Sequence, residues 1–254
     1  MARLDRFFIT ELLGKLGGAL LSPLTGFGAS LRRARLFHPE GAVYRATLRP
    51  LAAEDPLRLI GQRLSGPAIL RISTALWRGG REWTDALGIA LRLKKSDRLT
   101  EQPGPGDQDL LFATIRSPWT MLLAPLTTHQ HDFLQNDYYA VSPFEIAGFG
   151  RGKVRLVSSR HRVEGSTRAE RFDRAVLEGR AVFRLELRAL RSRAWKPVAE
   201  ITVEGRVLLD QESLRFSPFL AGRGIAPRGF IHALRHATYG SSQRLRPAGE
   251  GHVP

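Results

Sequence analysis

Short segments of alternating apolar and polar residues, separated by glycine and proline, constrain the fold of this chain more than any other feature. The alternation is clearest in Val43–Leu48, Ala181–Leu190 and Ile201–Leu209, and Ala68–Thr74 has a similar strand-like composition. A period of two residues is typical of strands that bury one face and expose the other. Short strands with frequent turn residues and no fixed repeat indicate a closed antiparallel sheet. We therefore predict an α+β architecture: an antiparallel β-barrel with flanking helices.

Helical patterns are few and lie between the strand segments. Leu57–Leu64 has the pattern of a short helix that ends at Gly66-Pro67, and a second helical pattern begins at Phe172-Asp173. These elements and the strands fit one barrel domain, which we expect to cover residues 35–247.

The N-terminal segment is apolar but is interrupted by charges. Glu11 and Lys15 lie within the apolar stretch Phe7–Leu31, which makes it a poor transmembrane helix and a poor signal peptide. We expect residues 1–34 to form an amphipathic helical segment that packs on the body of the protein, with peripheral membrane contact as the alternative. The expected location is cytoplasmic, with membrane association left open.

Composition excludes several kinds of chemistry. The 254 residues contain no cysteine, which rules out disulfides, thiolate catalysis, iron–sulfur clusters and thiolate-ligated haem. The formal net charge of +15 raises the hypothesis of a nucleic-acid or anionic-membrane partner. The basic residues are spread along the chain and no basic run interleaved with aromatic residues stands out, so nucleic acid is not the partner we expect.

Near the C-terminus, Arg235 and Tyr239 lie four residues apart and therefore share one face if the segment is helical. A guanidinium beside a phenol lowers the cost of ionising it, and a phenolate is a known ligand of haem iron. An isolated Arg-x-x-x-Tyr is more often an exposed helix packed on a core, so the pair needs support from elsewhere.

The segments around this pair resemble the proximal haem helix of the catalase family. Tyr239 is followed by Gln243-Arg244-Leu245-Arg246, which completes the family pattern R-x-x-x-Y-x-x-x-Q-R-x-R. Phe216-Ser217-Pro218 and Gly224-Ile225-Ala226-Pro227 resemble the F-x-P and G-I-x-P segments that lead into that helix. The resemblance implies that Tyr239 ligates the iron of haem b, that Arg235 stabilises its phenolate, and that Arg246 binds a propionate.

Two further segments resemble the distal side of the catalase site. Arg35-Leu36-Phe37-His38-Pro39-Glu40-Gly41-Ala42 is similar to R-x-x-H-x-x-G-A, and Arg71-Ile72-Ser73-Thr74 is similar to R-F-S-T. The resemblance implies that His38 is the distal base, that Ser73 hydrogen-bonds it, and that Arg35 and Arg71 bind propionates. A lone histidine beside proline and glycine is otherwise more often a loop residue.

The segment Gln108–Pro118 resembles N-N-T-P-x-F-F-I-R-D-P. Counting back from Arg116 places Gln108 at the distal asparagine of the family, with an amide one methylene longer. Met121 stands where the family often has a phenylalanine covering the haem. Both departures favour weak hydrogen peroxide dismutation.

The resemblance extends in order from Arg35 to Arg246, and it implies a minimal catalase-like, eight-stranded barrel. The function we expect is a haem-dependent peroxidase with weak catalase activity, which uses hydrogen peroxide or an organic or lipid hydroperoxide and a small organic reductant. The alternatives are a fatty-acid hydroperoxide isomerase or dehydratase of the allene oxide synthase type, and a non-enzymatic haem- or lipid-binding barrel. A homo-oligomer stays open.

His129 and His131 form a second, weaker candidate site. Two histidines at this spacing share one face of a strand, as metal ligands can, but no third ligand is evident nearby. We expect a solvent-exposed loop here.

Overall fold

The computed structural model describes residues 41–75, 81–117, 123–140, 142–211 and 213–228. The predicted N-terminal segment, residues 1–34, lies outside the described residues. So does the greater part of the predicted proximal segment, from residue 229 onward.

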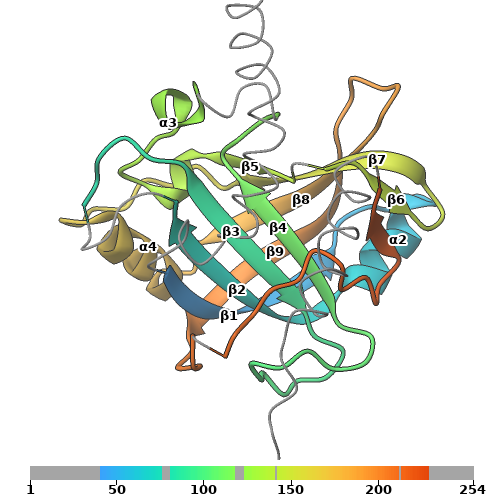
Figure 1. Ribbon diagram of the computed structural model, residues 1–254, viewed down its shortest axis with the longest axis horizontal. Coiled ribbons are helices and arrows are strands. Elements are labelled where there is room, and N and C mark those ends of the chain that lie inside the picture. The colour runs from blue at the N-terminus through green and yellow to red at the C-terminus, as the bar shows by residue number, and fades with distance from the viewer. Residues whose placement is uncertain (1–40, 76–80, 118–122, 141, 212, 229–254) are drawn as a thin grey trace, which may run out of the picture.

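Eight antiparallel strands form a closed barrel, which confirms the predicted fold (Figure 1). The order around the barrel is β7-β5-β4-β3-β2-β1-β9-β8, and pairing of β7 with β8 closes it. The strands are β1 (Gly41–Pro50), β2 (Gly66–Thr74), β3 (Leu87–Leu93), β4 (Gln108–Ala113), β5 (Asp137–Tyr139), β7 (Gly150–Ser158), β8 (Val182–Ala189) and β9 (Lys196–Arg206). Two short strands, β6 (Phe144–Ile146) and β10 (Ile225–Pro227), extend the sheet beyond the edge of β7.

Among the described residues, three helices and one 3-10 turn flank the barrel: α2 (Leu57–Leu64), α3 (Ala124–Thr127), α4 (Arg168–Leu177) and η2 (Phe133–Gln135). The predicted helix at Leu57–Leu64 is confirmed. The second helix begins at Arg168 rather than Phe172, because the Thr167 side chain accepts a hydrogen bond from the Glu170 backbone N–H and caps the helix there. None of the helices in the described ranges is long and apolar enough to cross a membrane.

One strand differs in extent from the prediction. The alternating pattern suggested Ile201–Leu209, whereas β9 begins at Lys196 and ends at Arg206. The early start comes from pairing, since Lys196 lies opposite Leu187 and Pro197 opposite Glu186 on β8. Proline interrupts a strand pattern in the sequence, so the alternation does not show that β9 begins before Ile201.

The barrel interior is filled by apolar side chains from all eight strands. On β2, for example, Ala68, Leu70 and Ile72 point inward and are at most 2% exposed. α4 adds Phe172 to the same core, where its ring lies 5.0 Å from that of Tyr44 in an edge-to-face contact. Each large apolar side chain buried in this way contributes about 1.5–3 kcal/mol, which makes the interior the main source of stability.

A buried ion pair fixes two loops to the outside of the barrel. Arg92 on β3 and Asp109 on β4 are both 0% exposed, and their two parallel hydrogen bonds measure 2.7 and 2.8 Å. Arg92 also donates to the backbone carbonyls of Glu101 and Arg215, and Asp109 accepts from the Ser217 N–H at 2.7 Å. Buried charges are tolerated when their hydrogen-bonding capacity is met in this way.

Removing one member of this pair leaves the other charge buried without a counter-ion. We expect Asp109→Asn to lower the free energy of unfolding by about 3–5 kcal/mol, because the buried Arg92 loses its counter-ion. The matched control is Asp137→Asn, which removes a 2.6 Å ion pair to Arg160, whose side chain is 49% exposed. That control loses at most about 1 kcal/mol. Urea denaturation measures both, and equal losses would contradict this role of the buried pair.

Candidate functional site

Three of the predicted site residues are described: Arg71, Ser73 and Gln108. The other predicted site residues, and Met121, lie outside the described residues: Arg35, His38, Arg235, Tyr239 and Arg246. The geometry of the candidate site is therefore built from the strands that carry the first three.

Arg71 and Ser73 lie on the outer face of the barrel. They alternate along β2 with Leu70 and Ile72, which belong to the interior core, and a strand directs successive side chains to opposite faces. Ser73 is 5% exposed, and its hydroxyl lies 3.5 Å from the carbonyl oxygen of Gly88. Arg71 and Ser73 thus share one face of the sheet.

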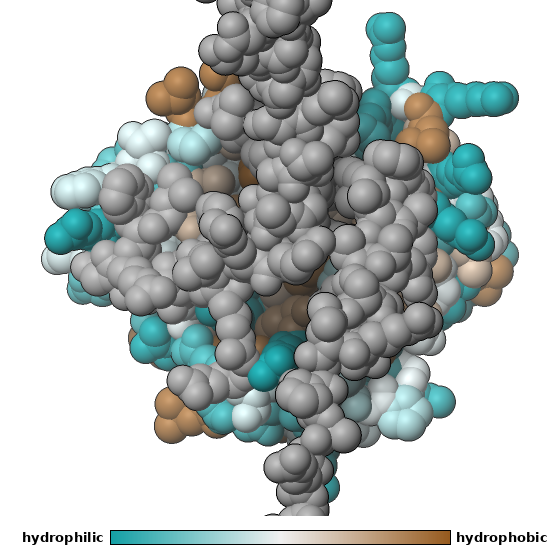
Figure 2. All heavy atoms as spheres, viewed as in Figure 1, coloured by the Kyte–Doolittle hydropathy of each residue, from teal (hydrophilic) through white to brown (hydrophobic). Residues whose placement is uncertain are grey.

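Small residues surround Ser73 on this face. Ser73 pairs with Gly41 on β1 and with Gly88 on β3, and Gly88 pairs in turn with Ala113 on β4. In the neighbouring row, Ala90 lies opposite Arg71. We call Gly41, Ser73, Gly88, Ala90 and Ala113 the small-residue face. In Figure 2, seen from the side that shows β3 and β4 in Figure 1, some hydrophobic residues are visible between the grey atoms near the middle.

The opposite side of the barrel has a different outer surface. The outward-facing residues of β7 and β8 are mostly long and basic: apart from Val157 and Val182 they include Arg151, Lys153, Arg155, Arg184, Glu186 and Arg188. Such a surface is suited to water and ions, whereas the small-residue face lets a flat apolar group approach the sheet closely.

A cation borders the small-residue face. The Arg71 guanidinium lies against Gly41, so that a Cβ placed on Gly41 would be 2.8 Å from Arg71 Cζ. Burial lowers the pKa of Arg71 from its ordinary value, although a guanidinium stays charged at neutral pH. The face therefore combines an apolar surface with a positive charge at its edge.

Gln108 does not lie on the small-residue face. It is 0% exposed, and its side chain is on the same side of β4 as the core residues Leu110 and Phe112. It pairs with Leu93, at the opposite end of the β3–β4 ladder from the Gly88–Ala113 pair. Gln108 therefore points to the other face of the sheet from Ser73 and lies at the other end of the strands. Counting residues back from Arg116 could not reveal this, because a count ignores which face a side chain occupies.

The Gln108 amide is also fully engaged. Its Nε2 donates to the carbonyl oxygens of Asp109, Leu220 and Ile225 at 2.9–3.1 Å, and its Oε1 accepts from the Arg223 N–H at 3.2 Å. Gln108 therefore anchors residues 220–225 to the end of the barrel. The described residues give no support to the predicted contact between this amide and bound peroxide.

His131 belongs to a charge cluster instead of a histidine pair. Its Nδ1 lies 2.9 Å from Glu82, which also accepts a hydrogen bond from Arg171 at 2.8 Å and one from the Arg168 N–H. Burial alone would raise the pKa of Glu82, but these hydrogen bonds and the charges of Arg171 and Arg168 hold it below its ordinary value. In the described part of the chain, no three acidic or histidine side chains are grouped as a metal site. The partners come from α4 and a distant loop, so the sequence offered no signal for the cluster.

Comparison with protein-family models found no match, and neither did comparison with curated proteins. Among solved structures, the chain is similar to catalase A from Saccharomyces cerevisiae, with a TM-score of 0.53 and 12% sequence identity. The similarity covers 86% of this chain and 63% of that chain, so the present chain spans less than two thirds of the catalase. At this identity the similarity concerns the fold and carries no function with it. The chain has a catalase-like fold.

Proposed function

We propose that this protein is a haem-dependent enzyme that metabolises hydroperoxides, acting as a peroxidase with weak catalase activity. The observation that carries the proposal is the position of Arg71 and Ser73. Both residues were identified from a short catalase-like string, and both lie on one outer face of a barrel with a catalase-like fold. Around them is a surface with the shape and charge that a haem needs.

The small-residue face suits a porphyrin. A porphyrin is flat and mostly apolar, and carries anionic propionates along one edge. Glycine, alanine and serine at Gly88, Ala90, Ala113 and Ser73 let such a ring lie close to the strands. Arg71 at the border would neutralise a propionate through charge-assisted hydrogen bonds.

The covalent chain adds a second argument. His38 precedes Gly41 by three residues, and Gly41 is paired with Ser73. Three residues of extended chain span at most about 11 Å. This short connection is compatible with the proposed role of Ser73, which is to hydrogen-bond and orient the His38 imidazole.

Each residue has a distinct role in the proposal. A bound haem supplies the electrons exchanged with the peroxide. Tyr239 holds the iron as a phenolate, and Arg235, four residues earlier, stabilises that negative charge. His38 removes a proton from one peroxide oxygen and returns it to the other. Gln108 has no part in the proposal, because its amide is bound to the backbone.

Propionate binding involves more than one arginine. Arg35 and Arg246 share with Arg71 the proposed role of neutralising the propionates. Arginine suits this task because its planar fork matches a carboxylate and its charge does not depend on pH in the physiological range.

Haem ligation by Tyr239 has a direct spectroscopic test. We expect protein reconstituted with ferric haem to show a Soret band with high-spin ferric features, and Tyr239→Ala to lose it. Tyr44→Phe is the control, because Tyr44 lies in the apolar interior of the barrel, away from the proposed site, and its hydroxyl donates to Asp173 at 2.7 Å. An unchanged spectrum in Tyr239→Ala would refute ligation by this residue.

Filling the small-residue face should exclude the haem. We expect Ala90→Phe to reduce haem occupancy at least about ten-fold, because the added ring occupies the surface on which the porphyrin lies. Thr202→Phe, an outward substitution on β9 away from this face, should bind haem normally. Haem titration measures occupancy, and circular dichroism confirms that both variants are folded. Equal haem binding by the two variants would place the haem elsewhere.

The distal roles predict different effects on turnover. His38→Ala should keep its haem and lose about 100-fold or more in peroxide reactivity, because it removes the general base. Ser73→Ala should lose about ten-fold, because the imidazole remains but is less well oriented. Stopped-flow absorption with hydrogen peroxide and a phenolic donor measures both. If only a polyunsaturated fatty-acid hydroperoxide is consumed, the peroxidase assignment fails.

A further inference from the structure

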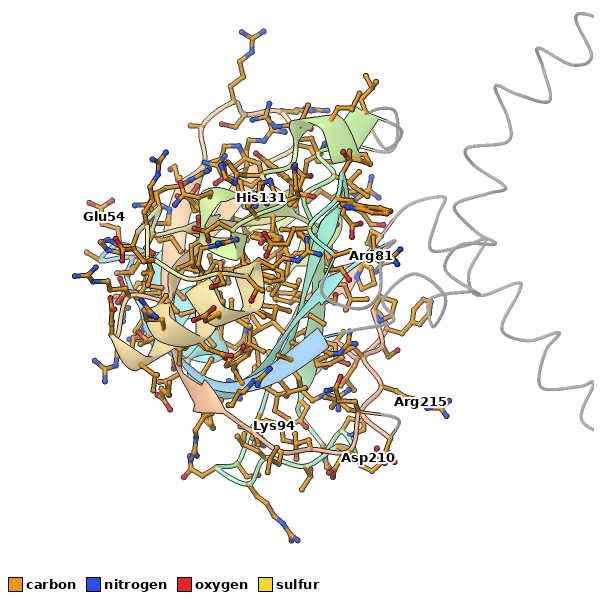
Figure 3. The ribbon with its side chains drawn as sticks, turned by 90° about the vertical axis from the view of Figure 1, so that its left-hand side faces the viewer. Glu54, Arg81, Lys94, His131, Asp210 and Arg215 are labelled. Atoms are coloured by element: carbon orange, nitrogen blue, oxygen red, sulfur yellow. The ribbon has the colours of Figure 1, made fainter. Side chains whose placement is uncertain are left out.

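Four basic side chains gather around a hollow at the other end of β2. The hollow has a volume of about 350 Å³ and is lined by Arg63, Gly66, Lys94, Lys95, Gly106 and Arg223, with adjoining backbone. We call it the basic hollow. Gly66 precedes Ser73 by seven residues along β2, which corresponds to about 23 Å, so the basic hollow is separate from the small-residue face. Figure 3 shows Lys94 toward one end of the barrel and His131 toward the other.

The charges at the basic hollow do not balance. Asp107 accepts from Lys94 Nζ at 2.6 Å, from the Gly104 N–H at 2.7 Å and from the Lys95 N–H at 3.0 Å. Its carboxylate is therefore paired with Lys94 and with backbone. Within the described ranges, no carboxylate forms an ion pair with the three remaining cations, Arg63, Lys95 and Arg223. Three positive charges at one hollow repel each other unless an anion is present.

Arg63 and Arg223 are held in fixed positions by backbone carbonyls. Arg63 donates through Nε to the Arg223 carbonyl at 2.8 Å and through Nη2 to that of Ala147 at 2.9 Å. Arg223 donates through Nη1 to the carbonyls of Arg63 and Ser65 at 2.9 and 2.7 Å, and through Nη2 to that of Lys94. These neutral acceptors orient the guanidinium groups without neutralising them. Burial lowers the pKa of Arg223, and the nearby charge of Asp107 partly opposes this shift.

Donors remain available on the same groups. Each guanidinium has five N–H donors, and the hydrogen bonds to described residues leave Arg63 Nη1 and Arg223 Nε unused. Donors already fixed in place bind an anion at a lower cost in conformational entropy than flexible ones.

The ordinary structural explanation covers only part of this arrangement. Arg223 binds carbonyls at the C-terminal end of α2, where basic side chains are commonly found. That explanation does not account for Lys95. Its aliphatic chain lies over Gly106, where an added Cβ would be 2.9 Å from Lys95 Cδ, and its ammonium group adds a third charge to the same hollow.

We propose that the basic hollow binds the phosphate group of a small phosphorylated molecule. A phosphate monoester carries close to two negative charges at neutral pH and three acceptor oxygens, which match the excess of four cations over the one carboxylate of Asp107 better than a single carboxylate would. The volume of about 350 Å³ holds a phosphate with a few attached carbon atoms. Gly66 leaves space beside its backbone, because only the Lys94 carbonyl oxygen, at 3.9 Å, lies within 4 Å of an added Cβ.

The test is an amide NMR titration with inorganic phosphate, and with sodium chloride at the same ionic strength as the reference. We expect saturable shifts at Gly66, Lys95, Gly106 and Arg223 with phosphate and not with chloride. Lys95→Gln should weaken phosphate binding about five-fold by removing one exposed cation, without affecting the fold. Arg98→Gln removes an exposed cation that does not line the hollow, and should change the affinity less than two-fold.

Inorganic phosphate, glycerol 3-phosphate and lipid vesicles together show whether the ligand is a small soluble molecule or a lipid headgroup. Glycerol 3-phosphate should bind at least as tightly as inorganic phosphate and shift the same amides. Vesicles of phosphatidylcholine with phosphatidic acid should compete no better than glycerol 3-phosphate at equal phosphate concentration. Shifts with chloride equal to those with phosphate, equal effects of Lys95→Gln and Arg98→Gln, or binding to the vesicles alone would overturn the proposal.

Discussion

Pairing of β7 with both β5 and β8 closes the sheet on itself, and the remaining features follow from this closure. An eight-stranded barrel encloses just enough space for its own inward-facing side chains. Here that space holds a continuous apolar cluster that includes Tyr44, Leu70, Leu156 and Phe183. A ligand the size of a haem has no room inside. A haem would therefore have to lie on the outer surface of the barrel.

Different parts of the outer surface carry different kinds of side chain. On β1 to β4 the residues around Ser73 are small, and the rows nearer Lys94 contain the buried pair of Arg92 and Asp109. On β7 and β8 the outward side chains are mostly long and basic. A fold with one interior and several distinct outer surfaces can carry a haem site at one end and an anion site at the other without either disturbing the core.

The sequence alone predicted the barrel, but it did not reveal contacts between residues that are far apart in the chain. Strand alternation predicted the barrel, because that signal is local. The structure puts Arg71 and Ser73, which were taken from the resemblance to R-F-S-T, on one outer face, and their roles stay a proposal. Gln108 shows the limit. Its role at the distal site was predicted by counting residues back from Arg116. In the structure its amide donates hydrogen bonds to the carbonyl oxygens of Leu220 and Ile225, which are more than 100 residues away. The pairing of Arg63 with Arg223 was missed for the same reason, since it joins α2 to the last described loop.

The central claim, that a haem lies on the small-residue face, is tested most directly by paramagnetic relaxation in the ferric haem complex. High-spin iron broadens the signals of nearby amides and leaves distant ones sharp. The account predicts that the amides of Ser73, Gly88, Ala90 and Ala113 broaden, while those of β7 and β8 such as Lys153 and Leu185 do not. Broadening centred on β7 and β8, or none on the small-residue face with haem bound, would contradict it.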